Sequence, residues 1–159
     1  MIRLILAALW PGLSDIGEVE MKKMRQPAES AVLKALLLFE RSVKLKLNAD
    51  IERTGIVYGS DRNARGQFRH QHQASAPGEP PAPQSGDLRK SITHDGPTWD
   101  GDEVSGEVGT NIPYARILEF GGVTGRGHLT RILPRPYMAP TFIEQRTAIE
   151  TILATAVRS

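Results

Sequence analysis

The stretch AESAVLKALLLFERSVKLKLN, from Ala28 to Asn48, sets the architecture of this chain. Its apolar residues recur at intervals of three and four, which predicts a long amphipathic helix. Pro27 is expected in the first helical turn, while Lys44 and Lys46 lie at the end where the helix dipole favours positive charge. Further leucines widen the apolar stripe. We therefore expect this helix to be sandwiched in the core, shared with a partner subunit, or both.

Three further segments predict a small α+β domain around this helix. TGIVY (54–58) and QFRHQHQ (67–73) are separated by turn formers, which predicts a β-hairpin. EVSGEVGT (103–110) alternates valine and glycine with polar residues, as a half-solvated strand does. From Pro140, apolar residues at helical spacing predict a terminal helix. Both long helices are expected to pack on a small antiparallel sheet.

Short helices are predicted on either side of the 103–110 strand. Gly86–Thr93 follows Ser85, and Tyr114–Phe120 follows Asn111; serine and asparagine both cap helix N-termini. The second short helix is expected to end at paired glycines. VTGRGHLTR (123–131), which comes next, is expected to be a flexible loop.

Length and composition favour a single domain over residues 1–159. The chain has 159 residues and a mass of 17.5 kDa, enough to bury one core. Its net charge of +2 and pI of about 9.1 are only mildly basic, unlike a protein whose whole surface binds nucleic acid. The absence of cysteine excludes a disulfide framework, a thiolate metal site and a cysteine nucleophile.

Residues 1–15 form an apolar N-terminal segment. We expect it to be a short helix or an arm that packs Ile2, Leu6 and Leu9 on a neighbouring surface. The apolar run Leu4–Trp10 is at the short limit for a signal peptide, and no small-residue cleavage site follows it. No stretch reaches the ~20 apolar residues of a membrane span, so no membrane partner is expected.

Histidine spacing gives only a weak metal signal. His70 and His72 would share one side of a strand, but no segment offers a third ligand, so solvated histidines are the favoured interpretation. His94 and His128 lie in turn-like sequence. The chain carries no phosphate loop, no dinucleotide fingerprint and no hydrolase or metalloprotease motif. We expect no metal and no cofactor.

Two sets of charged residues admit more than one interpretation. Glu119 is either a catalytic acid or a structural anion that pairs with Arg135 or with a neighbouring subunit, and the structural role is favoured. Arg62, Arg65 and Arg69 lie on the predicted hairpin. They either touch DNA phosphates or form a solvated or intersubunit face, the second being favoured.

A proline-rich segment, residues 74–85, separates the two halves of the chain. Four of the eight residues in Ala76–Pro83 are proline, which biases the backbone to polyproline II and excludes helix or central strand. Because such a segment is already stiff, it loses little entropy when it docks. We expect it to be an arm that reaches a neighbouring subunit.

The order of these segments, from 28 to 157, resembles the tail-component family of long-tailed bacteriophages, whose members are neck, tail-completion or head-tail joining proteins. The residues that carry the resemblance are Ala76, Pro77, Gly78, Glu79, Pro80, Gly86, Leu88, Ser91, Ile92, Tyr114, Ala115, Glu119, Phe120, Gly121, Arg135, Pro136 and Pro140. Residues 1–15 and 99–102 depart from it; the latter are expected to be a variable turn.

The resemblance implies a non-enzymatic virion protein, assembled in the host cytoplasm, that forms a ring around the DNA channel between head and tail. It implies a hexamer or dodecamer that contacts the head connector or head-completion protein, the tail terminator or tail tube, and transiently the genomic DNA. Interface candidates are Pro77, Pro80, Pro81, Glu119, Phe120, Arg135 and Pro136; DNA-channel candidates are Arg62, Arg65 and Arg69. The alternatives are a tail terminator ring and a DNA-binding protein that uses the 62–72 hairpin.

Strand edges are a further expected means of assembly. An exposed edge at 54–58 or at 103–110 would add to a neighbour's sheet through main-chain hydrogen bonds. Head-to-tail contacts of this kind close into rings when the rotation between subunits permits.

Overall fold

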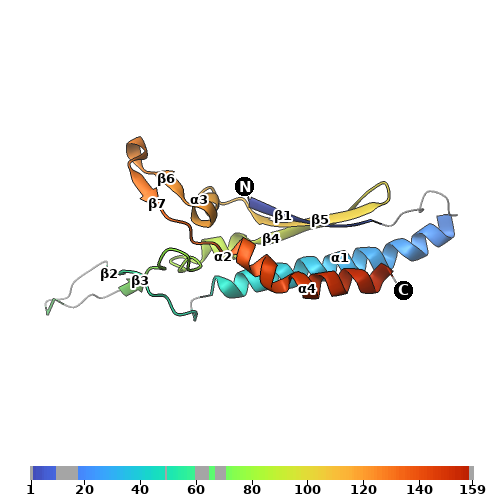
Figure 1. Ribbon diagram of the computed structural model, residues 1–159, viewed down its shortest axis with the longest axis horizontal. Coiled ribbons are helices and arrows are strands. Elements are labelled where there is room, and N and C mark those ends of the chain that lie inside the picture. The colour runs from blue at the N-terminus through green and yellow to red at the C-terminus, as the bar shows by residue number, and fades with distance from the viewer. Residues whose placement is uncertain (1, 10–17, 49, 60–64, 67–70, 158–159) are drawn as a thin grey trace.

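The computed structural model describes residues 2–9, 18–48, 50–59, 65–66 and 71–157. It is an elongated α+β subunit, as predicted, with two long helices beneath a sheet and two small hairpins at one end (Figure 1). The elements are β1 (Ile2–Leu9), α1 (Glu18–Lys46), β2 (Val57–Gly59), β3 (Gln71–Gln73), α2 (Asp87–Ser91), β4 (Thr93–Asp100), β5 (Glu103–Thr110), α3 (Ala115–Phe120), β6 (Gly122–Thr124), the 3-10 turn η2 (Arg126–His128), β7 (Thr130–Ile132) and α4 (Met138–Val157).

The main sheet is antiparallel, with the strand order β1-β5-β4. The predicted alternation of β5 is confirmed, because Val104, Gly106 and Val108 are buried while the residues between them are partly exposed. The buried residues lie over α1, and a side chain at Gly106 would collide with Leu36 of that helix. One face of the sheet is therefore closed by α1.

Helix α1 lies between the sheet and α4, which confirms the predicted sandwich. Its buried residues follow the helical period; they are Ala28, Ala31, Val32, Ala35, Leu36, Phe39, Val43 and Leu47. Phe39 meets Phe142 of α4 edge to face, with ring centroids 6.1 Å apart. Burying one such side chain contributes about 1.5–3 kcal/mol, so this stripe supplies much of the core.

The N-terminal segment was predicted as a short helix or an arm, and the helix prediction is wrong. Ile2–Leu9 is strand β1, paired with β5 from Ile2 opposite Thr110 to Leu9 opposite Glu103. A short apolar run fits a strand as well as a helix, so periodicity alone could not separate them. Because β1 covers β5 on one side and β4 covers it on the other, β5 is central, and the exposed edge expected at 103–110 is wrong.

Two further corrections concern α1 and β4. Helix α1 begins at Glu18, so Pro27 lies inside it and not in its first turn. Trp99 belongs to β4 and not to a variable turn; its indole Nε1 donates to Glu29 at 2.7 Å, and Arg25 lies over its ring. The pairing register of β4 shifts at Pro97, where a β-bulge accommodates the proline. Because proline is rare inside strands, the sequence did not predict a strand here.

Two hairpins extend from the end of the subunit where α1 stops (Figure 1). Strands β2 and β3 pair antiparallel, which confirms the predicted hairpin; β2 begins at Val57 and not at Thr54, and residues 67–70 of the predicted second strand lie outside the described residues. Strands β6 and β7 form the second hairpin, where a flexible loop was predicted over 123–131. It follows directly on α3, which begins after Tyr114 and not at an Asn111 cap, and which ends at Gly121 with φ 72°.

Replacing Gly106 by alanine should destabilise the sheet–helix contact. The added Cβ would lie 2.5 Å from Leu36 Cδ1 and 2.9 Å from the Asp95 carbonyl oxygen, so backbone and core must shift. We expect G106A to lose roughly 1–3 kcal/mol of unfolding free energy, measured by urea denaturation. Ser105→Ala, on the neighbouring residue of the same strand, is the matched control; equal stability of both variants would contradict the packing described.

Candidate functional site

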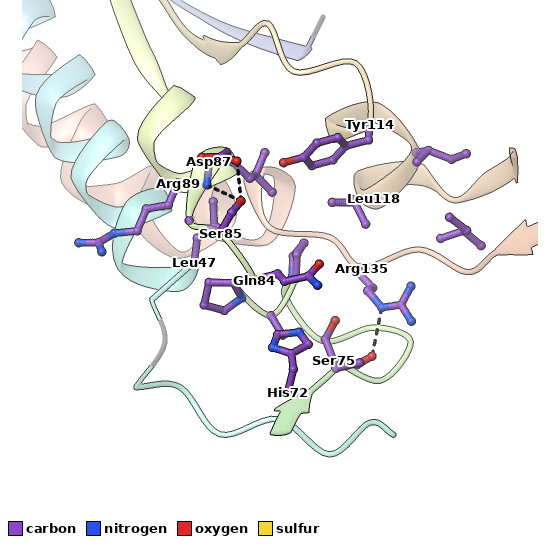
Figure 2. A pocket seen from close by; sticks show the side chains of 18 of the residues that line it. Leu47, His72, Ser75, Gln84, Ser85, Asp87, Arg89, Tyr114, Leu118 and Arg135 are labelled. Atoms are coloured by element: carbon purple, nitrogen blue, oxygen red, sulfur yellow. Dashed lines mark hydrogen bonds between the residues drawn. The ribbon is translucent and has the colours of Figure 1, made fainter. Parts of the chain in front are cut away.

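The proline-rich segment is docked onto its own chain in the single subunit. Gly78 donates its backbone N–H to the Pro134 carbonyl at 2.8 Å, and Arg135 Nε donates to the Ser75 carbonyl at 3.1 Å (Figure 2). Arg53, itself buried, donates to the Pro81 carbonyl at 3.4 Å. The segment thus links the base of the β2–β3 hairpin to the strand-like stretch before α4. Its expected contact with a neighbouring subunit stays a prediction.

Glu79 fixes the turn at the start of this segment. Its carboxylate accepts hydrogen bonds from the Thr54 hydroxyl, from the Thr54 backbone N–H at 3.1 Å and from the Ala76 backbone N–H at 2.8 Å. The Thr54 hydroxyl, with the two backbone donors, holds the pKa of Glu79 below its usual value. The ionised carboxylate is therefore the form that holds the turn together.

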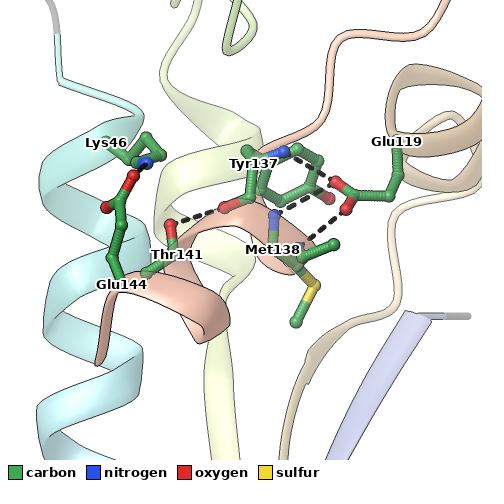
Figure 3. A network of polar contacts seen from close by, with 7 residues as sticks. Lys46, Glu119, Tyr137, Met138, Thr141 and Glu144 are labelled. Carbon is green, nitrogen blue, oxygen red and sulfur yellow. Dashed lines mark hydrogen bonds and ion pairs between the residues drawn. The ribbon is translucent and has the colours of Figure 1, made fainter. Parts of the chain in front are cut away.

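Glu119 was predicted to pair with Arg135, and this pairing is wrong. The Glu119 side chain is 4% exposed and accepts backbone N–H groups from Tyr137 at 2.8 Å, Met138 at 3.1 Å and Ala139 at 2.9 Å (Figure 3). These are donors that a helix N-terminus leaves unsatisfied, and the helix dipole favours a negative charge there. Glu119 therefore caps α4 from the neighbouring helix α3.

Arg135 holds the same junction through other atoms. Its backbone N–H donates to the Leu118 carbonyl at 2.6 Å, while its side chain donates to Ser75. Arg135 and Glu119 thus each tie α3 to the chain at the start of α4, although not through one ion pair. The structural interpretation of Glu119 fits this geometry, because its oxygens face backbone donors and no cavity.

A cavity of about 540 Å³ lies between the proline-rich segment, α2, α3 and the β2–β3 hairpin (Figure 2). Much of its lining is apolar; among these residues are Leu47, Pro81, Pro83, Leu88, Tyr114, Ile117, Leu118 and Ile132. Ser85, His72 and Asp87 also line it, but Ser85 donates directly to Asp87, and His72 hydrogen-bonds to neither of them. The described residues of this cavity therefore lack the serine–histidine contact of a hydrolase.

The other predicted site residues are spread over the subunit. Phe120 is 64% exposed and Pro77 is exposed, whereas Pro81 is buried and Pro80 and Pro136 are partly buried. Arg65 is exposed beside the β2–β3 hairpin; Arg62 and Arg69 lie outside the described residues. The structure thus places Glu119 and Arg135 at the junction of α3 with the start of α4, places Pro81 with Arg135 in the lining of the cavity, and leaves Phe120 and Pro77 on the surface.

Sequence reasoning missed the surface of the β6–β7 hairpin. Next to Phe120 the hairpin exposes Val123, Leu129 and Leu133, and Leu129 is 88% exposed. The available signal was the run of closely spaced glycines, which lie at the start of β6 and in the turn between β6 and β7. Contiguous exposed apolar residues of this kind mark an interaction surface.

The described part of the chain contains neither a membrane-spanning helix nor a cluster of metal-binding side chains. No described helix has the length and hydropathy needed to cross a bilayer. Among the same residues, no three histidine, aspartate or glutamate side chains lie close enough to hold a metal ion.

Comparison with known proteins gives a family and one curated relative. The family model described as "Bacteriophage HK97-gp10, putative tail-component" matches residues 62–121. The predicted resemblance to phage tail components is confirmed. The match runs from the β2–β3 hairpin through the proline-rich segment to α3 and Gly121, so it includes Glu79 and Glu119. No solved structure is significantly similar to the chain.

The curated relative is a Mu-like prophage FluMu G protein 2 from Haemophilus influenzae. It is 44% identical to this chain over 45 residues, which is 28% of this chain and 33% of the relative. The chain therefore matches about a third of the relative's length. Residues 62–121 are thus similar to a phage tail component, and a 45-residue stretch is similar to a prophage protein.

Replacing Glu79 should change how stability depends on pH. Because the folded-state pKa of Glu79 is lowered, its contribution is complete above the usual value of 4.5 and is lost as pH falls through the folded pKa. We expect E79Q to be less stable than wild type at neutral pH and to lose less stability on acidification. Urea unfolding across a pH series measures this, with E52Q, an exposed glutamate nearby, as control; parallel curves for wild type and E79Q would contradict it.

Replacing Glu119 should loosen the junction between α3 and α4. E119A leaves buried N–H groups without an acceptor, so we expect a loss of roughly 2–4 kcal/mol in unfolding free energy. E119Q, which keeps the shape and one strong acceptor, should lose less. Glu144→Ala, which breaks an exposed ion pair with Lys46, is the control and should cost under about 1 kcal/mol. A loss for E119A no larger than the control's would rule out the capping role.

Proposed function

We propose that this protein is a structural virion protein that forms a ring at the phage head-tail interface, as a neck or tail-completion protein around the DNA channel. The observation that carries the proposal is the tail-component match over residues 62–121. A ring of identical subunits, a hexamer or dodecamer, would join the head connector or head-completion protein to the tail tube or its terminator. We assign the protein no catalytic role.

The exposed hairpins favour an oligomeric protein over a monomeric one. The β6–β7 hairpin exposes Val123 and Leu129, and the β2–β3 hairpin exposes Val57 and Tyr58, with Ile56 just before it at 70% exposure. Both hairpins extend from the same end of the subunit, away from the packed helices (Figure 1). Apolar side chains on projecting hairpins gain stability when a neighbouring surface covers them.

The free edge of β1 offers a second means of assembly. Within the described residues β1 pairs only with β5, which leaves its other edge without a strand partner. The sequence IRLILAAL contains no proline and a single charged residue, Arg3, so it has little of the protection that natural edge strands carry. A strand from a neighbouring subunit would extend the sheet there through main-chain hydrogen bonds.

Several finer roles belong to the same proposal. Pro77 and Phe120 are the exposed interface candidates, and Arg62, Arg65 and Arg69 are the candidates for transient contact with the genome. A tail terminator ring remains the alternative within the same class, and its distinction requires the position of the ring in the particle. The DNA-binding alternative would use the same arginines as a β-ribbon.

The test is the mass and shape of the purified protein. Light scattering over a concentration series should give a discrete oligomer, and averaged electron micrographs should show a closed ring with a central hole. Labelling of that ring in phage particles should then place it at the junction of head and tail. A monomer that binds DNA in a salt-sensitive way, and loses binding in R62A/R65A/R69A, would overturn the proposal in favour of the DNA-binding alternative.

A further inference from the structure

Charge is segregated between two parts of the chain that are separated by residues 111–119. From Thr93 to Thr110 there are five acidic residues and no lysine or arginine. From Phe120 to Tyr137 there are three arginines and no acidic residue. The first part forms the β4–β5 hairpin and the second contains the β6–β7 hairpin, so the sequence contrast becomes a contrast between two surfaces.

The acidic surface consists of the β4–β5 hairpin and its turn. In the pairing register Asp100 stands opposite Glu103. Like charges directly opposite each other on one face of a sheet are destabilising. Asp95 and Asp100 are exposed, and neither they nor Asp102 and Glu103 form an ion pair with any described residue. A cationic partner would relieve this repulsion.

The basic surface is the β6–β7 hairpin. Arg126 and Arg131 are exposed, and neither forms an ion pair within the described part of the chain. Val123 and Leu129 lie exposed on the same hairpin, so the surface is both cationic and apolar. Arg135 is excluded from this surface, because its side chain is bound to Ser75.

The two surfaces cannot meet within one subunit. The β6–β7 hairpin projects beyond α3, at the end of the subunit opposite the β4–β5 turn (Figure 1). Their charges and positions therefore suit two different copies, with the hairpin of one facing the sheet of the next. A contact between unlike surfaces is heterologous, which is the kind that builds closed rings.

We infer that the β6–β7 hairpin of one copy docks on the acidic β4–β5 hairpin of the next copy, with Arg126 and Arg131 facing Asp100 and Glu103. This inference rests on the proposed ring and names the surfaces that join its subunits. Arginine and carboxylate form strong, directional hydrogen bonds, and Val123 and Leu129 add apolar contact. DNA is the poorer partner for the hairpin, because its exposed Leu129 would remain in water on a phosphate backbone.

Charge reversal on each surface tests the contact. R126E/R131E makes both surfaces acidic, and D100K/E103K makes both basic, so each variant alone should lose association by more than about tenfold in dissociation constant. An equimolar mixture should assemble again, because each variant supplies the surface that the other lacks. Wild-type assembly should also weaken as salt is raised, since exposed charges are screened.

Matched controls separate the contact from general effects of charge. K34E/R41E and D50K/E52K reverse the same numbers of exposed charges on and just after α1. Circular dichroism and urea unfolding establish that every variant is folded. Light scattering then measures the association of each variant, each control and the mixture. Variants that associate like their controls, or a mixture of folded variants that stays monomeric, would overturn the inference.

The outcomes also separate this contact from the ring itself. If wild type and both variants form the same closed ring, the contact is wrong and the ring stands. If the mixture recovers association but micrographs show only open chains or dimers, the contact stands and the ring fails. Because the chain contains no cysteine, a cross-link between cysteines introduced at Arg126 and Asp102 would report on this contact alone. Its absence in wild-type-like rings would count against the contact.

Discussion

The Glu119 carboxylate accepts three backbone hydrogen bonds from residues 137–139, and this contact joins α3 to the first turn of α4. Two long helices could pack through apolar stripes alone, but their packing does not determine where the intervening segments go. The contact between Glu119 and the N-terminus of α4 determines their course, because it fixes the point at which the chain returns from the β6–β7 hairpin to the core. The directions of α3, the hairpin and α4 all follow from it.

The proline-rich segment depends on the same junction. Gly78 and Ser75 are bound by Pro134 and Arg135, the residues that directly precede the capped turn. Glu79 then ties the segment to Thr54, at the base of the β2–β3 hairpin. Only the Gly78–Pro134 hydrogen bond joins two backbone groups, while the others join the Arg135 or Glu79 side chain to the chain beside it. Both hairpins are thereby held by one rigid region, which suits surfaces that must meet a neighbour in a defined geometry.

The helices and the central strand could be predicted from sequence, because burial imposes a period on their residues. The edge strands could not. The run from Ile2 to Leu9 is apolar apart from Arg3 and carries no period, and Pro97 gives β4 the pattern of a turn. The role of Glu119 was predicted as structural, but its partners were not. Every residue except proline carries a backbone N–H, so the sequence does not show which of these groups Glu119 binds. The β6–β7 hairpin was not predicted, because its glycines indicate turns but do not show that the residues beside them form strands.

The pairing of β1 with β5 joins residues separated by most of the chain, with Ile2 opposite Thr110. Contacts between residues so distant in sequence form late, because a long loop must close before they contribute. During synthesis the first strand therefore has no partner until the ribosome has passed Thr110. The free edge that we propose for assembly is created only when this pairing forms. A chain that stops before Thr110 lacks a complete β5, and would therefore also lack the paired β1 edge by which we propose that the subunit joins a neighbour.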